Sequence, residues 1–213
     1  MKNKIQVYPL HILKQIFINK NNINFNKLQL TSNGIFSVSK YNAALHLKTL
    51  IYKFFNKNKN ITITDATANC GSDTIIFGLF FKHVNSIELD TTNFKALKNN
   101  IKQYNLNNVK LFHGSAINII QNLKTSNCIY IDAPWNGVDY KNHSSIKLYL
   151  DNIEISEIYN IYYKYTELFI FKVPVNYDFT YFIQYTHIKK YYIDSYTDKY
   201  NNIRFYYIII STL

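Results

Sequence analysis

Hydrophobic positions follow two rhythms along this chain, and their alternation predicts a sheet. The apolar runs ITIT, VNSI, VKLF, CIYI and LFIF are separated by segments whose apolar residues recur at helical spacing. Strands that alternate with helices favour a parallel sheet with right-handed crossovers. Two aromatic runs, 188–196 and 203–211, then flank the polar turn TDKYNN and predict an antiparallel hairpin. We therefore predict an α/β fold with a mostly parallel seven-stranded sheet, helices on both faces and this hairpin at one edge.

The first 60 residues show helical patterns instead. A short helix is predicted near Pro9, because proline is favoured in the first turn of a helix. A second helix is predicted from SVSKYNAALHLKTLIYKFF, with Ser37 or Ser39 as its N-cap. Its apolar face consists of Ala43, Leu47, Leu50, Ile51 and Phe54. We expect residues 1–36 to form a small helical extension and residues 37–213 to form the main domain.

Positive charge is concentrated in the first part of the chain. The net charge is +11, residues 1–64 contain ten lysines and no acid, and the first acid is Asp65. One explanation is a solvated surface biased toward lysine by an AT-rich genome. The other is a surface that faces a polyanion such as nucleic acid. Codon bias alone would not remove every acid from 64 residues, so the polyanion-facing surface is preferred.

The composition argues against several classes of protein. No stretch has the ~18 consecutive apolar residues of a membrane span. The start, MKNKIQVYPLHILKQ, lacks the apolar run and small-residue cleavage site of a secretory signal. Cys70 and Cys128 lie far apart and outside any C-x-x-C pattern, which argues against a disulfide framework and a zinc site. We expect an intracellular monomer, in the cytoplasm or nucleus, that binds neither metal nor membrane.

Polar residues gather where the first two predicted strands end, and parallel sheets bind ligands at that edge. The first strand is followed by the loop DATANCGSDT, residues 65–74, in which Gly71 allows a tight turn. An ordinary strand–helix turn with Asp73 as N-cap is the alternative for this loop. The second strand ends in SIELD, where an acid is placed to accept hydrogen bonds from ribose hydroxyls. Glu88 fits that spacing, and Asp90 is its rival.

The fourth predicted strand ends in the unusual sequence IDAPWNGVDY. Asp132 closes the strand, the backbone is kinked at Ala133–Pro134, and the chain's one tryptophan, Trp135, follows. A carboxylate can accept the hydrogens of an exocyclic amine, and an indole stacks well on an electron-poor ring. We interpret this stretch as a site for a nucleic-acid base. The alternative is a tryptophan that packs under the loop as an anchor of the core.

Six segments in the right order resemble the trimethylguanosine synthases, a family of class I S-adenosylmethionine-dependent methyltransferases. These enzymes methylate the exocyclic amine of a 7-methylguanosine RNA cap. The clearest segments are GIFSVSKYNAALHL, similar to G-W-F-S-V-T-P-E-x-I-A-x-H-I, and DATANCGSDTIIFG, similar to D-A-F-C-G-V-G-G-N-T-I-Q-F-A. The most specific is IYIDAPWNGVDY, similar to [SD]-P-P-W-G-G-P-D-Y. VNSIELD, NNIKQYN and VPVNYD complete the series, so the resemblance runs from Leu30 to the C-terminus.

The resemblance implies a Rossmann-like fold, S-adenosylmethionine as cofactor and capped RNA as partner. The implied cofactor-binding residues are Ser39, Asp65, Ala66, Asn69, Gly71, Asp73, Thr74, Glu88, Leu89 and Ser115. The implied transfer site is Asp132, Ala133, Pro134 and Trp135, with Trp135 stacked on the cap base. The candidate RNA and cap contacts are Trp135, Ser37, Lys27, Lys172 and Asn176. Such a transfer needs neither a metal nor a covalent nucleophile.

The chain departs from the family pattern at several positions. Asn69 and Ser72 replace loop glycines, and Asn69 is the milder change because asparagine tolerates positive φ. Ser115 replaces the acid expected at the adenine, Asn136 replaces a glycine, and Val175 replaces the arginine expected at the cap phosphates. Phosphate recognition is therefore the part of the resemblance that is least supported.

Two other functions remain open on the sequence. One is methylation of another base amine, because the D-P-P-Y motif of adenine methyltransferases is matched about as well as the cap motif. The other is a methyltransferase-fold RNA-binding subunit that has lost catalysis, given the altered loop. The trailing NGVDY and the upstream FSVS favour the cap. A compact chain from an AT-rich genome would suit a virus, in which case the host cytoplasm is the expected compartment.

Overall fold

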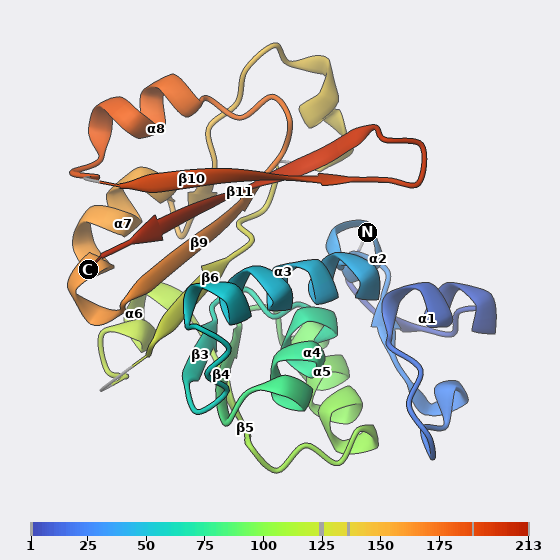
Figure 1. Ribbon diagram of the computed structural model, residues 1–213. Coiled ribbons are helices and arrows are strands. Elements are labelled where there is room, and N and C mark those ends of the chain that lie inside the picture. The colour runs from blue at the N-terminus through green and yellow to red at the C-terminus, as the bar shows by residue number, and fades with distance from the viewer. Residues whose placement is uncertain (1, 124–125, 136, 189, 213) are drawn as a thin grey trace. The chain divides into compact units, whose positions relative to one another are not determined.

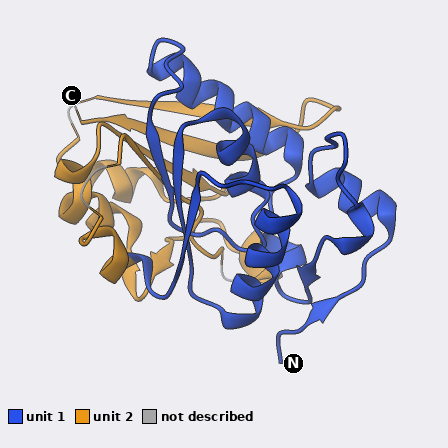
Figure 2. Ribbon diagram, turned by 90° about the horizontal axis from the view of Figure 1, so that it is seen from below, with its two compact units in different colours: residues 1–116 blue, residues 117–213 orange. Residues whose placement is uncertain are grey.

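The strands and helices of the chain fall into two sets, each with its own packing. The computed structural model describes residues 2–123, 126–135, 137–188 and 190–212. Figure 1 labels the elements. Contacts divide the chain into unit 1, Met1–Ala116, and unit 2, Ile117–Leu213, which Figure 2 shows in different colours. Seven strands form a mostly parallel sheet. Unit 1 supplies three of them and unit 2 supplies four.

Unit 1 contains a three-stranded parallel arrangement with helical crossovers, as the alternating pattern predicts. Its strands lie in the order β3-β4-β5, with Asp65 beside Ser86 and Glu88 beside His113 in the register. The carboxyl ends of β3 and β4 therefore carry the two acids singled out from the sequence. The elements are β3 (Thr62–Asp65), α4 (Ser72–Phe80), β4 (His83–Glu88), α5 (Thr91–Gln103) and β5 (Val109–His113), with α3 (Tyr41–Phe54) packed on α4.

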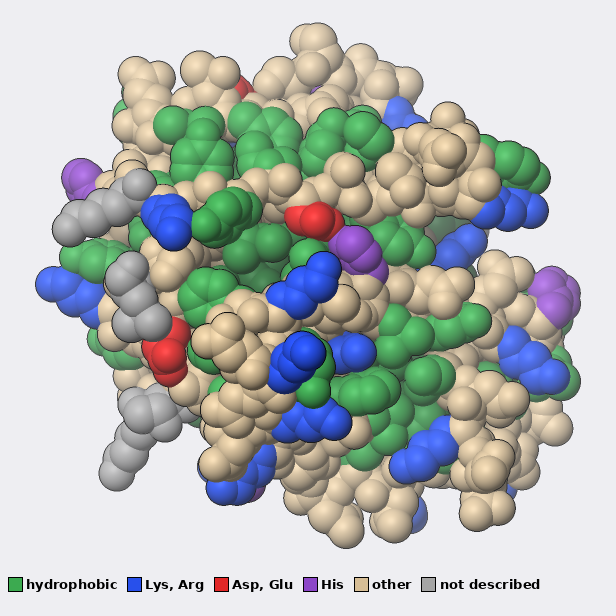
Figure 3. Space-filling model, in the orientation of Figure 1, with side chains coloured by type: hydrophobic (Ala, Val, Ile, Leu, Met, Phe, Trp, Pro, Cys, Tyr) green, Lys and Arg blue, Asp and Glu red, His purple; other side chains and the backbone are tan. Residues whose placement is uncertain are grey.

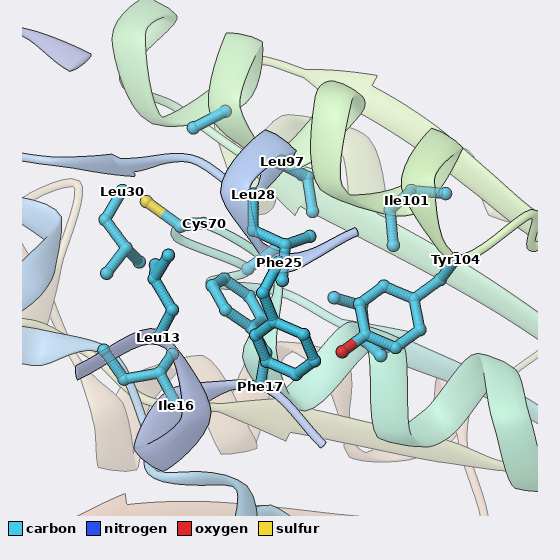
Figure 4. Packing of buried hydrophobic residues seen from close by; sticks show 13 residues of the cluster. Leu13, Ile16, Phe17, Phe25, Leu28, Leu30, Cys70, Leu97, Ile101 and Tyr104 are labelled. Atoms are coloured by element: carbon cyan, nitrogen blue, oxygen red, sulfur yellow. The ribbon is translucent and has the colours of Figure 1, made fainter. Parts of the chain in front are cut away.

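The first 36 residues pack into unit 1 instead of standing apart from it. Figure 4 shows aromatic and aliphatic side chains of this segment in one cluster with residues of the loop after β3 and of α5. Members from the two sides include Phe17, Phe25, Leu28, Cys70, Leu97 and Ile101. The phenol of Tyr104 also donates to the Ile18 carbonyl at 2.6 Å. The segment contains β1 (Ile5–Gln6), α1 (Leu10–Ile16), η1 (Phe25–Lys27) and β2 (Leu30–Thr31), and α2 (Gly34–Ser37) follows it.

Unit 2 contains the predicted C-terminal hairpin. β6 pairs in parallel with β9, β9 is antiparallel to β11, and β11 is antiparallel to β10. Every residue of β9 is buried. The strands are β6 (Cys128–Ile131), β7 (Tyr149–Leu150), β8 (Ile153–Glu154), β9 (Leu168–Val173), β10 (Tyr191–Thr197) and β11 (Ile203–Ser211). The helical segments are α6 (Ala116–Ile120, which begins at the last residue of unit 1), η2 (Val138–Asn142), α7 (Ile155–Tyr162), η3 (Tyr163–Tyr165) and α8 (Phe179–Tyr185).

The helix starts differ from those expected. Lys40 is the N-cap of α3 and makes no side-chain cap bond, so the prediction of Ser37 or Ser39 as N-cap is wrong. The N-cap of α4 is Gly71, not Asp73. Both serines instead hydrogen-bond to other parts of unit 1, which the local pattern cannot show. No helix in the described part of the chain has the length and apolarity needed to cross a membrane.

Candidate active site

The loop after β3 is shaped by a buried carboxylate. Asp65 is fully buried at the end of the strand, and its Oδ2 accepts a 2.6 Å hydrogen bond from the Thr74 hydroxyl. Its Oδ1 accepts a longer bond from the Thr67 amide at 3.4 Å. The Thr74 hydroxyl also lies 2.9 Å from that of Ser86. Asp65 thus ties the start of the loop to the first turn of α4, which holds the intervening backbone in place.

Two residues of this loop have left-handed backbone conformations. Gly71 has a φ of 95°, and a Cβ there would lie 2.7 Å from Leu97 Cδ1, so glycine is required. Asn69 has a φ of 50°, a conformation that asparagine tolerates better than most residues. Its side-chain amide donates to the Gly34 carbonyl at 3.1 Å and to the Ser37 hydroxyl at 3.0 Å. The replacement of a family glycine by Asn69 therefore keeps the turn and links it to α2.

Glu88 and Asp90 have different roles at the end of β4. The Glu88 carboxylate accepts one backbone N–H on each oxygen, from Asn69 and from Asp90, both at 2.7 Å. Burial raises the pKa of Glu88, and the two backbone hydrogen bonds oppose that rise. Asp90 caps α5, since its Oδ1 accepts from the amides of Thr92 and Asn93 at 2.8 Å. Glu88 is therefore the acid oriented by the loop, and Asp90 is the structural one.

The other predicted cofactor residues of unit 1 lie around the same strand ends. The Ser39 hydroxyl donates to Asp73 Oδ2 at 2.6 Å, and both residues are buried. Ala66 is buried in the loop, whereas Leu89, directly after Glu88, is 57% exposed. Ser115 directly precedes α6.

His113 has a structural environment at the end of β5. Its ring stacks on Phe94 with centroids 4.8 Å apart. Its Nε2 lies 3.2 Å from the Leu89 carbonyl and 3.3 Å from the Thr91 hydroxyl. These contacts hold the ring in place within unit 1 and supply no argument for a catalytic base.

The chemistry of this edge fits a nucleoside cofactor. A carboxylate oxygen has more than one lone pair, so Glu88 can accept hydrogen bonds from ribose hydroxyls besides the backbone bonds it already accepts. The exposed Leu89 side chain beside it offers an apolar surface for a flat base. Asn69 Oδ1 is buried without a hydrogen-bond partner among the described residues and can accept a bond from a bound group. S-adenosylmethionine has hydroxyl, amine and apolar parts that match these residues.

Asp132 and Trp135 lie together in unit 2, at the end of the buried strand β6. Asp132 is largely buried, Ala133 is buried and Pro134 is exposed. The Trp135 ring meets Tyr140 edge-on with centroids 5.3 Å apart and lies 6.3 Å from Phe205. Its indole N–H is near enough to lower the pKa of Asp132, but it makes no hydrogen bond of full geometry to a described residue. Asn136 lies outside the described residues.

Lys172 forms an ion pair with Asp132. Its ammonium lies 2.7 Å from Asp132 Oδ2, and the two side chains are 6% and 14% exposed. The same Nζ lies 5.6 Å from the centre of the Trp135 ring and 4.8 Å from that of Phe205. Burial raises the pKa of Asp132, and the charge of Lys172 counteracts that rise. One cation thus contacts both the carboxylate and the indole of the predicted motif.

The remaining predicted cap contacts differ in their surroundings. The Asn176 side-chain amide donates to the carbonyls of Tyr140 and His143, both at 2.8 Å, so it fastens the segment after Trp135. Val175 is half exposed, and Lys27 in unit 1 is exposed.

The sequence patterns missed the side chains around Trp135. Phe205 comes from the last strand and Tyr140 from the motif's own DY pair. The consecutive aromatic residues of β11, Phe205 to Tyr207, indicated that this strand presents rings to both faces, but not to which neighbours. Among the described residues, no group of three or more His, Cys, Asp or Glu side chains is arranged to hold a metal ion.

The sequence of the chain matches the model of one protein family. Residues 60–209, more than half of the sequence, match the model of the RNA cap guanine-N2 methyltransferases. The chain belongs to this family. The matched range contains Asp65, Glu88, Asp132 and Trp135.

A viral protein and many solved structures are similar to this family member. Uncharacterized protein L320 of Acanthamoeba polyphaga mimivirus is 31% identical over 128 residues, which are 58% of the chain and 50% of that protein. The chain thus spans about half the length of that relative. An O-methyltransferase from Bacillus cereus, solved in complex with SAH, has a TM-score of 0.59 at 14% identity over 82% of the chain and 83% of its own.

A further structure with the same fold is a putative RNA methyltransferase, PH1948, from Pyrococcus horikoshii. It has a TM-score of 0.56 at 14% identity over 81% of this chain and 84% of its own. These structures show the fold, which is that of the Rossmann-like class I methyltransferases. The family match and the class I methyltransferase fold agree, and together they support S-adenosylmethionine as the cofactor.

Proposed function

We propose that this chain transfers a methyl group to the exocyclic amine of the guanine in a 7-methylguanosine RNA cap. The observation that carries the proposal is the grouping of Asp132 and Trp135 at the end of β6, within a chain that belongs to the cap guanine-N2 family. A carboxylate and an indole side by side can bind an aromatic ring that carries an amine. Trp135 would stack on the base, and Asp132 would accept the amine hydrogens.

The chemical demand on the protein is mainly one of positioning. S-adenosylmethionine, when bound, supplies a methyl group already activated by its sulfonium. The guanine amine is a poor nucleophile because its lone pair is delocalised into the ring. Asp132 can accept hydrogen bonds from the amine as its nitrogen becomes tetrahedral, which makes the nitrogen lone pair more available for attack on the methyl carbon. Trp135 can fix the plane of the base. Correct orientation of this kind can lower a barrier by about 7–11 kcal/mol.

The unit 1 residues are proposed to hold the cofactor. Glu88 would bind the ribose hydroxyls, and Leu89 would pack on the adenine. Ser115 would lie at the adenine, at the position that the family motif indicates. Ser39, Asp73 and the loop from Asp65 to Thr74 would hold the methionine end. The support is the fixed geometry of this loop and the orientation of Glu88 by two backbone amides.

The basic N-terminal part is proposed to bind the RNA phosphates. Lys2, Lys4, Lys14, Lys20 and Lys27 are all exposed, and no acid precedes Asp65. On the face shown in Figure 3, basic side chains clearly outnumber acidic ones. Such a surface attracts a polyanion of any sequence and would compensate for Val175, which stands where the family has an arginine.

The mimivirus relative supports the interpretation of the chain as viral. We infer that capped RNA in a host cell is its substrate. We further propose that the chain works as a monomer, without a metal.

Replacing Trp135 tests the proposed function directly. Trp135→Ala should lower transfer to a capped RNA by about 5–150-fold while leaving S-adenosylhomocysteine binding intact, because stacking is worth about 1–3 kcal/mol per base. Lys199→Met, a change at an exposed residue of the β10–β11 turn, is the control and should behave as the parent. A parent protein that binds the cofactor but methylates no cap would refute the proposal. A Trp135→Ala variant that unfolds would instead favour the core-anchor reading.

A further inference from the structure

Lys172 is a cation inside a strand whose other members are apolar. All six residues of β9, LFIFKV, are buried, and the lysine side chain is only 6% exposed. An ammonium is expensive to dehydrate, and a well-packed apolar side chain of similar size would usually be at least as favourable for stability. Stability therefore does not explain why a lysine occupies this position.

The ion pair and the two ring contacts of Lys172 lie at the proposed transfer site. Its Nζ pairs with Asp132 at 2.7 Å and lies over the rings of Trp135 and Phe205. Asp132 is 40 positions away in the sequence and belongs to the end of the neighbouring strand β6. One buried charge thus bridges the strand end, the tryptophan and the C-terminal hairpin.

We propose that Lys172 is a positioning residue for methyl transfer, which keeps the Asp132 carboxylate ionised and braces the Trp135 indole beside it. The proposal rests on the proposed function, because that function assigns Asp132 to the target amine. Lys172 acts through these two residues and need not touch the substrate.

The physical reason is the protonation state that Asp132 requires. An ionised carboxylate only accepts hydrogen bonds, whereas a protonated one also presents an O–H donor toward its surroundings. Burial raises the pKa of Asp132, while the Lys172 ammonium from β9 and the Trp135 indole N–H from its own loop oppose the rise. Without Lys172, the same burial would favour the neutral acid, which is a poorer acceptor for an amine.

This assignment differs from a phosphate contact, the role first expected for Lys172. A lysine that binds RNA phosphates is normally exposed, as Lys27 is. Lys172 is buried and already paired with a carboxylate at 2.7 Å. A backbone phosphate would have to displace Asp132 to reach it.

The test compares three forms of the full chain. Lys172→Met removes the charge and keeps the length of the side chain, whereas Lys172→Arg keeps the charge. Lys199→Met is the control, since Lys199 also lies over a ring, that of Tyr200 at 4.8 Å, but is exposed. Each form is assayed for kcat and KM with capped RNA, for S-adenosylhomocysteine affinity, and for the pKa of Asp132 by carbon-13 NMR of labelled aspartate.

The proposal predicts a specific set of results. Lys172→Met should lower kcat about tenfold or more, with KM for RNA changed by less than about threefold, as expected for an interaction needed at the transition state. It should raise the pKa of Asp132 by about 1–3 pH units. Lys172→Arg should recover part of kcat and leave the pKa of Asp132 near that in the parent. Cofactor affinity should stay constant in all forms.

Other results would overturn it. An unchanged kcat together with an unchanged pKa of Asp132 in Lys172→Met would leave Lys172 without this role. A rise in KM alone would mark it as a phosphate contact. If Lys172→Met does not fold, two other variants test the proposal. It then requires that Lys172→Arg is active, and that the double variant Asp132→Asn with Lys172→Met folds but is inactive. If the parent methylates no cap, the proposed function fails, and the NMR titration still decides whether Lys172 controls Asp132.

Discussion

Two acids at the end of β4 show how a single residue's surroundings decide its role. Glu88 and Asp90 carry the same charge two positions apart, and the sequence left both as candidates for the ribose. In the structure Asp90 is the N-cap of α5, whereas the Glu88 carboxylate accepts hydrogen bonds from two backbone amides. Mutation of Glu88 should therefore affect cofactor binding, whereas mutation of Asp90 should affect the stability of the fold.

We predict that Glu88→Ala weakens S-adenosylhomocysteine binding by about 10–100-fold, because the ribose hydroxyls would lose an acceptor. Asp90→Ala is the matched control and should cost about 0.5–2 kcal/mol in the free energy of unfolding, as the loss of an N-cap does. Calorimetric titration and urea unfolding measure the two effects. Equal cofactor affinity in the parent and Glu88→Ala would remove Glu88 from the cofactor site.

Asp132 should be important for stability as well as for transfer. Asp132→Asn leaves the buried Lys172 ammonium without its charge partner, so we expect a loss of about 3–5 kcal/mol in the free energy of unfolding. The double variant Asp132→Asn with Lys172→Met removes both charges and should recover most of that loss. Urea unfolding of the two variants checks this. A double variant less stable than Asp132→Asn alone would mean that the charge pair is not the source of the effect.

At the scale of elements, the loop between β3 and α4 depends on an asparagine in a left-handed conformation. Asn69 combines a φ of 50° with side-chain bonds to Gly34 and Ser37. A glycine would keep the backbone conformation and lose the side-chain bonds, and an alanine would lose both. The loop and α2 are therefore coupled through one side chain.

Two substitutions at Asn69 should separate these contributions. Asn69→Gly should change the free energy of unfolding by less than about 1 kcal/mol, since glycine adopts positive φ without strain. Asn69→Ala should cost about 1–2 kcal/mol more, because left-handed backbone is unfavourable for a residue with a Cβ. Unfolding midpoints of the two variants measure the difference. Equal stability of the two would show that the backbone conformation is not what matters at this position.

The elements could be predicted from the sequence better than their contacts. The apolar runs predicted the strands of both units because each is short and followed by a polar segment, and β6 and β9 are also fully buried. The N-cap of α3 was missed because Ser39 is bonded to Asp73, which follows 34 positions later. The pair of Asp132 and Lys172 was missed for the same reason, since nothing local marks Lys172 as buried. Helix α8 (Phe179–Tyr185) has only seven residues and was not predicted.

At the scale of the whole chain, the N-terminal part combines a structural role with a basic surface. Its apolar side chains join the core of unit 1, while its lysines are exposed. The same segment can therefore carry positive charge for RNA without being a loose tail. The expected boundary at residues 36 and 37 stays a prediction, although residues on both sides of it share one hydrophobic cluster.

Removing charge from this segment should weaken RNA binding of any sequence. We predict that replacing Lys2, Lys4, Lys14 and Lys20 with Gln flattens the dependence of log affinity on log salt, by about 0.7 per lost phosphate contact on single-stranded RNA. Methylation of a small cap analogue should stay nearly unchanged, because it offers few phosphates. Four exposed lysines elsewhere, Lys82, Lys164, Lys190 and Lys199, serve as the control set. If the parent and the N-terminal variant show the same salt slope, these lysines do not contact RNA phosphates and form only a solvated surface.

The most direct measurement of the central claim is the position of the transferred methyl group. The protein is incubated with isotope-labelled S-adenosylmethionine and a mixture of RNAs that carry a 7-methylguanosine cap, an unmethylated guanosine cap or no cap, and the RNAs are digested to nucleosides for mass spectrometry. We predict that the label appears on the exocyclic amine of 7-methylguanosine and that its transfer requires Asp132 and Trp135. Label on adenosine, or no label from a protein that binds S-adenosylhomocysteine, would contradict it.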